Sequence, residues 1–473
     1  MAKQNKATDD TTREYPRKIK RTLINVLCIV GLIFLIASSG SGCTCESTTT
    51  TSTPATTENI TCPELIFSDP EFAFEIRRTL SGVLTGEADL GEVLYTASRI
   101  ADGDTESWYQ EWYATAEHFR EAGDESLAKG HDVSAREAYY RASTYYRTAE
   151  FFLHGDPSDP RILETWGKSR DLFLAAANLD TVPFEVVEIP YEDTTLPAYF
   201  YSVDTSGEPR PLLIVQTGFD GCQEELHPYA MEGIKRGYNV LTFEGPGQGA
   251  VIRLQHLPFR PDWENVVTPV VDYAVSRPDV DKDRMALWGI SLGGYLAPRG
   301  AAYEHRLAAV VADAGVYDVG LNLWHGAQEV GGELAKMSRE EFKEYLLTNP
   351  PEFNDAMEAV MKESTSERWF NEQGMYTFNT TSIALFWAKY MDYTLEGAAE
   401  LISCPVLVSY ATNDHFDPKG EQAKLLYDHI TSEKELLEFS EEYEADYHCQ
   451  MGAFAQAFAK KFDWLDGIIS KIS

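Results

Sequence analysis

A serine in a glycine-flanked turn constrains the fold of this chain more than any other feature. The apolar run 285–290 (MALWGI) is typical of a buried strand, and Ser291 follows it within the segment 289–293 (GISLG), directly before helical sequence. Glycines flank such a serine because a sharp turn leaves no room for a Cβ atom. A turn of this kind holds the hydroxyl clear of the sheet, at the start of the next helix. The pattern therefore predicts that Ser291 is a nucleophile.

Short runs rich in β-branched and aromatic residues follow residue 181 and predict a sheet. The first two, 184–191 and 196–202, are joined by an acidic turn, which predicts an antiparallel hairpin. The later runs alternate with helical stretches, which predicts mainly parallel pairing with right-handed crossovers. These later runs are 211–217, 238–244, 285–290, 308–314, 405–411 and 435–440.

Helical sequence precedes and interrupts the predicted sheet. Residues 63–180 carry apolar and aromatic side chains at helical spacing, which predicts a domain of paired antiparallel helices. Core packing is the expected role of most of these aromatic residues. Between about 317 and 400 the strand pattern lapses into sequence rich in Glu, Met, Phe and Trp. We expect this segment to form a helical cap inserted into an α/β domain that spans 181–473.

The N-terminal sequence is typical of an export signal or a membrane anchor. A basic head, 1–21, precedes the segment 22–45, which begins with an almost wholly apolar run, and a Ser/Thr-rich linker follows at 46–62. The apolar run of about 16 to 20 residues is short for a spanning helix, so both readings stay open. Cys43 adds a third, a lipoprotein site. In each case we expect a protein at the cell membrane with its catalytic domain outside the cytoplasm.

Charge and cysteine spacing argue against several classes of partner. The formal net charge is −35, although the head is basic, so the rest of the surface repels nucleic acid and anionic lipid. The seven cysteines show no spacing typical of a zinc site. The glycine-rich turn 245–249 lacks the Lys-Ser/Thr pair of a phosphate loop and contains Pro246. We therefore expect no nucleic-acid partner, no metal and no cofactor, and we interpret the turn as one that shapes the pocket.

A serine nucleophile requires a histidine base and an acid that orients the histidine. Asp414 and Asp417 follow the seventh predicted strand, and His448 follows the eighth, so the order serine, acid, histidine is the one typical of such sheets. Asp414 is preferred to Asp417 because it stands nearer the strand, in a turn-like Asn-Asp pair. Two other histidines precede the last strand and are poorer candidates for the base; they are His415 and His429.

Acyl transfer also requires two backbone N–H donors for the developing oxyanion. The residue after the nucleophile, Leu292, supplies one, and the loop TGFDG after the third predicted strand supplies the other, from Phe219. Asp220 in this loop is unusual, since a carboxylate there opposes negative charge unless it is protonated or hydrogen-bonded to substrate. Its two interpretations are a substrate-binding or proton-transfer residue and a turn residue that caps the next helix.

Together these motifs resemble the esterase FrsA-like proteins of the α/β-hydrolase fold, which include 2,6-dihydroxypseudooxynicotine hydrolase and fungal polyketide-shortening hydrolases. The resemblance runs from about residue 108 to the C-terminus and rests on SAREAYYRASTYYRTAEFFLHGD, TGFDG, FEGPGQG, GISLGG, ATND and DYHC. It implies a mainly parallel eight-stranded sheet with flanking helices, a helical domain beside it, an active site between them and, often, a homodimer. It gives Ser291, Asp414 and His448 the triad roles. Asp220 stands where the nicotine-pathway enzyme has a glutamate, one carbon longer.

The expected function is that of a serine hydrolase acting on a small acyl substrate. Known proteins of this kind cleave esters or carbon-carbon bonds next to a carbonyl, so the resemblance leaves the scissile bond open. One alternative is a peptidase of the same fold, for which no peptide-terminus subsite is recognisable in the sequence. Another is a non-catalytic surface binding protein that kept the fold, against which the complete triad argues.

Overall fold

The computed structural model describes residues 66–348 and 350–472. The predicted basic head, signal or anchor segment and linker, residues 1–62, lie outside the described residues. Among the residues described, no helix combines the length and apolar character needed to cross a membrane.

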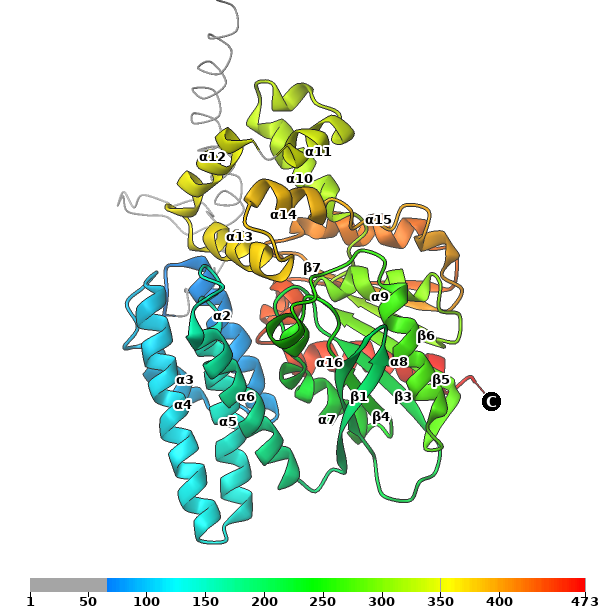
Figure 1. Ribbon diagram of the computed structural model, residues 1–473. Helices are drawn as coiled ribbons and strands as arrows, with labels where there is room; N and C mark the ends of the chain where they lie inside the picture. Colours follow the sequence, from blue (N-terminus) through cyan, green and yellow to red (C-terminus); the bar gives the residue numbers. More distant parts are fainter. Residues whose placement is uncertain (1–65, 349, 473) are drawn as a thin grey trace, which may run out of the picture.

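Helices α2 to α6 form a region beside the sheet, in blue to teal in Figure 1. Aspartates directly precede most of these helices and accept N–H bonds from the first turn, as Asp69 does from Glu71 and Phe72. The predicted aromatic stripes pack into a shared core that includes Trp108 and Tyr146. The bounds are α2 (Pro70–Ser81), α3 (Leu90–Ala97), α4 (Thr105–Ala128), α5 (Asp132–Glu150) and α6 (Pro160–Asn178).

The described chain forms one eight-stranded sheet in the order β1-β2-β4-β3-β5-β6-β7-β8. Strands β1 and β2 pair as an antiparallel hairpin and β2 is antiparallel to β4, whereas the remaining neighbours are parallel. The predicted hairpin and mainly parallel sheet are therefore confirmed. The bounds are β1 (Phe184–Tyr191), β2 (Thr194–Tyr201), β3 (Arg210–Gln216), β4 (Asn239–Phe243), β5 (Val280–Ile290), β6 (Ala309–Asp313), β7 (Val406–Ala411) and β8 (Lys434–Phe439).

Helices cover both faces of the sheet, which explains why its central strands are continuously apolar. In β3 the side chains alternate between the two cores, with Leu212 and Ile214 in one and Leu213 and Val215 in the other. Helices α8 and α9 contribute to the first core, and α7 and α16 to the second. The bounds are α7 (His227–Lys235), α8 (Glu264–Ser276), α9 (Gly293–Ala301), α15 (Glu421–His429) and α16 (Phe454–Ile469).

Helices α10 to α14 lie between β6 and β7 in sequence and stand over one end of the sheet in Figure 1. Helix α13 also contacts α2, so this cap segment meets the helical region above the strand ends. The loops that follow β3, β5 and β7 thus face a space bounded by the sheet, the cap and α2. The bounds are α10 (Val319–Val330), α11 (Arg339–Leu347), α12 (Pro351–Met361), α13 (Thr365–Thr377) and α14 (Ile383–Tyr390).

Candidate active site

Ser291 occupies the sharp turn between β5 and α9, as the glycine pattern predicts. Its φ angle is 61°, in the left-handed region that non-glycine residues rarely adopt. A Cβ atom added to Gly289 would lie 1.9 Å from the carbonyl oxygen of Gly293, so the turn can close only with glycine there. The local sequence therefore holds Ser291 in a strained, half-buried turn at the end of β5.

The structure brings the predicted serine, histidine and aspartate into one hydrogen-bonded chain. His448 Nε2 lies 2.9 Å from Ser291 Oγ, and His448 Nδ1 lies 2.6 Å from Asp414 Oδ2. Both distances fall within the usual range of hydrogen bonds. Asp414 is held in turn by the backbone N–H of Phe416, which donates to Oδ1 over 2.8 Å. The arrangement is that of a base oriented by an acid beside an alcohol.

Burial and neighbouring charge set the protonation states of His448 and Asp414. Burial by itself lowers the pKa of His448, but the negative charge of Asp414 prevails and raises that pKa well above its usual value. Burial raises the pKa of Asp414, while attraction to His448 prevails and lowers it. Asp414 is therefore ionised at neutral pH, and its negative charge favours the protonated form of His448.

The competing residues lie elsewhere or serve other contacts. Asp417 accepts N–H bonds of 2.9 to 3.2 Å from Gln422 and Ala423 at the start of α15, and burial raises its pKa to about 6. His415 packs against the ring of Phe416, and burial lowers its pKa to about 4. His429 hydrogen-bonds to Glu400 away from the site. Of these candidates, Asp414 and His448 are the pair that reaches Ser291.

The loop 217–222, which we call the oxyanion loop, lies directly against the serine turn. A Cβ atom added to Gly218 would lie 2.6 Å from the backbone nitrogen of Leu292, so the two backbones are in close contact. Within the described residues, neither the N–H of Phe219 nor that of Leu292 has a backbone or side-chain acceptor. Both predicted donors are therefore unpaired beside the nucleophile.

Two glutamines hold the carbonyl groups of the oxyanion loop. Gln248, from the turn 245–249, donates through Nε2 to the carbonyls of Thr217 and Gly218 over 2.9 and 3.1 Å. Gln373, from α13, donates to the carbonyl of Phe219 over 3.2 Å. The glycine-rich turn thus acts on the site through this loop and does not line the cavity. The role of Gln373 depends on a contact 154 residues away, which local sequence gives no signal for.

A cavity of about 250 Å³ opens at Ser291. The triad and the oxyanion loop form one side, and α2, α13 and α14 contribute the other. The lining is largely apolar and aromatic, and the ring of Phe219 itself packs against cap rings at centroid distances of 5.5 Å (Phe370) and 5.7 Å (Tyr390). Further aromatic residues of the wall are Phe74, Trp369, Trp387 and Phe416. Such a lining suits a compact, mainly apolar small molecule.

Two buried glutamates in the cavity wall were not identified from the sequence. Burial, and next the negative charge of Glu75, raises the pKa of Glu71 on α2 to about 8. Burial raises the pKa of Glu367 on α13 to about 7. Both carboxyl groups therefore hold a proton over much of the neutral range. On amphipathic helices such residues look like ordinary surface acids, and the facing segments bury them.

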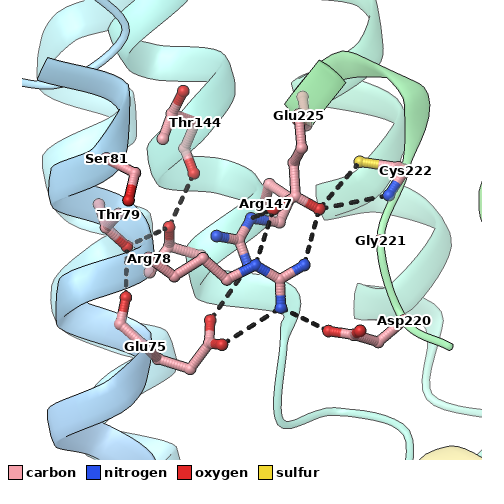
Figure 2. Close-up of polar contacts among 12 residues, drawn as sticks. Glu75, Arg78, Thr79, Ser81, Thr144, Arg147, Asp220, Gly221, Cys222 and Glu225 are labelled. Carbon is pink, nitrogen blue, oxygen red and sulfur yellow. Dashed lines mark hydrogen bonds and ion pairs between the residues drawn. The ribbon is translucent and has the colours of Figure 1, made fainter. Parts of the chain in front are cut away.

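Asp220 lies in the cavity wall and pairs with an arginine of the helical region. Its Oδ2 is 2.5 Å from Nη1 of Arg78 on α2, and its side chain is 13% exposed. Figure 2 shows that Arg78 also contacts Glu75 and Glu225. The start of the next short helix is capped by Cys222, so the capping interpretation of Asp220 has no support in the contacts.

The mainly parallel sheet, the strained serine turn and the hydrogen-bonded trio define an α/β-hydrolase. The chain belongs to the α/β hydrolase family, whose profile, described as "Alpha/beta hydrolase family", matches residues 216–460. A profile described as "Esterase FrsA-like" matches residues 91–321, and the resemblance seen in the motifs is therefore confirmed.

Curated relatives extend over most of the chain. "Hydrolase acrC" of Aspergillus aculeatus is 35% identical over 420 residues, which cover 84% of this chain and 96% of the relative. "20-hydroxy-prefusarin hydrolase FUS2" of Gibberella moniliformis is 32% identical and covers 85% of this chain and 97% of its own length. Among solved structures, the 2,6-dihydroxy-pseudo-oxynicotine hydrolase superposes with a TM-score of 0.64 at 20% identity, covering 83% of this chain and 95% of its own. That structural likeness shows the shared fold.

Proposed function

We propose that this hydrolase works through an acyl-enzyme formed on Ser291 and cleaves an ester, or a carbon-carbon bond next to a carbonyl, in a small molecule. The observation that carries the proposal is the continuous chain from Asp414 through His448 to Ser291, at 2.6 and 2.9 Å. A hydroxyl paired with a buried, acid-oriented imidazole is the arrangement that activates serine near neutral pH.

The proposed reaction begins when His448 Nε2 takes the proton of Ser291 Oγ as that oxygen attacks the substrate carbonyl carbon. The N–H groups of Phe219 and Leu292 donate to the oxyanion, and the carbonyl then re-forms as the scissile bond breaks. The imidazolium of His448 returns its proton to the leaving alkoxide or carbanion. A water molecule, deprotonated by the same histidine, attacks the acyl-enzyme and releases the acid and free Ser291.

Asp220 is the residue that we assign to substrate binding. Arg78 occupies one of its carboxylate oxygens, and within the described chain the other oxygen has no hydrogen-bond partner. That oxygen accepts a hydrogen bond from a hydroxyl, enol or amide of the substrate. Replacement of Asp220 by Asn is expected to raise KM for substrates that carry such a donor and to leave KM for simple acetate esters nearly unchanged.

The N-terminal sequence supports a proposal about location. On the basic head and the apolar run within 22–45, we propose that the protein is held at the cell membrane with the hydrolase outside the cytoplasm. Fractionation of cells that express the full chain, followed by protease treatment of intact cells, tests this. A hydrolase that stays in the soluble cytoplasmic fraction would contradict the proposal.

The test of the catalytic proposal is turnover of short and long acyl esters and of a β-diketone by the purified protein and by its Ser291→Ala variant. Ester or diketone cleavage that disappears in the variant supports the mechanism and identifies the scissile bond. Labelling by a fluorophosphonate, seen in the wild type and lost in the variant, supports a reactive Ser291 even before a substrate is known. Turnover retained by the folded variant would overturn the proposal.

A further inference from the structure

The oxyanion loop is held by charges that come from the helical region. Arg78 on α2 reaches Asp220 Oδ2 with Nη1 over 2.5 Å. The same guanidinium binds the carboxylate of Glu225, which follows the loop, with Nε and Nη2 at 2.9 Å each. Glu225 in turn accepts the backbone N–H of Cys222 over 3.3 Å. Arg78 therefore contacts both ends of the segment 220–225, which directly follows Phe219 (Figure 2).

A second arginine completes this cluster. Arg147 on α5 contacts Glu75 at 3.1 Å and Glu225 at 3.3 Å, and Glu75 also contacts Arg78 at 3.2 Å. Two guanidinium groups thus meet three carboxylates in a nearly buried cluster, where charge pairs are poorly screened. Burial raises the pKa of Glu225, yet the charges of Arg147 and Arg78 prevail and lower it, so this acid is ionised.

The placement of Asp220 creates an electrostatic problem that Arg78 resolves. Asp220 directly follows Phe219, the residue whose N–H is proposed to bind the oxyanion. An unpaired carboxylate at that point opposes the negative charge that develops in the transition state. Paired with a guanidinium, the carboxylate presents little net charge to the site, and the fork of hydrogen bonds fixes the direction of the loop.

We infer that Arg78 is a positioning residue of the active site, which orients the N–H of Phe219 through Asp220 and Glu225 and balances the charge of Asp220 during acyl transfer. The inference rests on the proposed serine mechanism and goes beyond it, because it makes α2 a working part of the oxyanion site. Gln248 and Gln373 hold the carbonyls of the same loop, but only uncharged groups take part in those contacts.

The experiment measures kcat and KM for p-nitrophenyl acetate and the rate of fluorophosphonate labelling in four proteins. They are the wild type, Arg78→Met, Asp220→Asn and the double variant. Arg78→Met is expected to lower kcat and the labelling rate by about 10-fold or more with little change in KM, because an oxyanion donor is misplaced and a carboxylate is left unpaired. In the double variant the unpaired charge is gone, so its kcat is expected to exceed that of Arg78→Met.

The matched control is Arg99→Met, which removes another arginine of the helical region, one that pairs with Glu111 at 2.5 Å and does not line the cavity. It is expected to keep wild-type kcat. Arg78→Lys keeps the charge but loses the forked contacts, so its kcat is expected to lie between those of the wild type and Arg78→Met. It replaces Arg78→Met in the comparison if that variant does not fold.

Each outcome bears on one proposal. Equal kcat and labelling rates in Arg78→Met, Arg78→Lys and wild type would overturn the positioning role while leaving the serine mechanism intact. A double variant no faster than Arg78→Met would overturn the charge-balancing part. A wild type that neither turns over esters nor reacts with the phosphonate would instead count against the proposed function itself.

Discussion

The two walls of the cavity differ in how the chain builds them. The triad wall consists of loops that directly follow strands and carries Phe219, Ser291, Asp414 and His448. The helix wall consists of α2, α13 and α14 and carries ionisable groups such as Glu71 and Arg78, which interact with residues far away in sequence. The sheet thus fixes the chemical groups locally, whereas the helices determine their electrostatic surroundings through long-range packing.

The strongest test of the triad wall is Asp414→Asn. An amide cannot hold His448 in the same tautomer or stabilise its imidazolium, so kcat is expected to fall about 10⁴-fold while the fold is retained. Steady-state kinetics on an activated ester measures this. Asp417→Asn is the matched control: it weakens the cap of α15 and is expected to keep most of the turnover. If Asp417→Asn proved the more damaging change, the assignment of the acid would be wrong.

Gly218→Ala tests whether close backbone contact, and not only charge, forms the oxyanion site. The new Cβ would lie 2.6 Å from the nitrogen of Leu292 and 2.7 Å from the carbonyl oxygen of Ile290, both backbone atoms that cannot rotate away. The loop must move, and a displaced N–H donor lowers the acylation rate by about 10²-fold. Stopped-flow measurement of the p-nitrophenol burst gives this rate. An unchanged burst would mean that the loop donates no essential N–H.

On the helix wall, Glu71→Gln tests the cost of burying an acid. The pKa of Glu71 is 4.5 in the unfolded chain and about 8 in the folded protein. Between these pH values the folded state binds more protons than the unfolded state. The free energy of unfolding of the protein therefore decreases as pH rises through that window. Each unit of pKa difference contributes about 1.4 kcal/mol, so the total for this group is on the order of a few kcal/mol. Below pH 4.5 the contribution is fully present.

Glutamine cannot ionise, so the variant is expected to lose less stability than the wild type between pH 5 and pH 8. Urea unfolding at both pH values measures the difference. Other buried acids, such as Glu244 and Glu367, titrate in the same range and affect both proteins alike. Identical slopes in the two proteins would show that Glu71 is not protonated in the folded state.

The smallest expected effect comes from Gly167→Ala in α6, in the helical region but away from the cavity. No atom lies within 4 Å of the added Cβ, so alanine is accommodated without strain. The change is expected to raise the free energy of unfolding by about 0.5 to 1 kcal/mol through helix propensity and to leave kcat unchanged. Thermal unfolding measures it. A loss of activity here would mean that the helical region affects catalysis more broadly than through Arg78.

The sequence predicted the triad wall well because its signals are local. Ser291, Asp414 and His448 each follow an apolar run that forms a strand, and the observed strands start and end within a few residues of the predicted runs, except that β5 begins earlier, at Val280. The glycines of the serine turn reflect steric limits that any such turn imposes. Local pattern and tertiary structure agree at these positions, so sequence reasoning was sufficient.

The helix wall could not be predicted in the same way. Arg78 and Asp220 are 142 residues apart, and nothing in the amphipathic pattern of α2 distinguishes an arginine that faces solvent from one that faces a loop. Nor does the sequence distinguish Glu71 from an ordinary acidic residue in the first turn of a helix. Their partners follow from how the helical region docks on the sheet, which depends on packing over the whole molecule.

Phe219 links the cap to the oxyanion loop. Its backbone N–H is assigned to the oxyanion, while its ring packs among Phe370, Phe386 and Tyr390 of the cap. Under the proposed mechanism, substitutions that reshape these rings to admit a new substrate would also shift the residue that donates to the oxyanion. We therefore expect cap substitutions that change specificity to alter turnover as well, and we expect directed evolution of the cap to need compensating changes in the oxyanion loop.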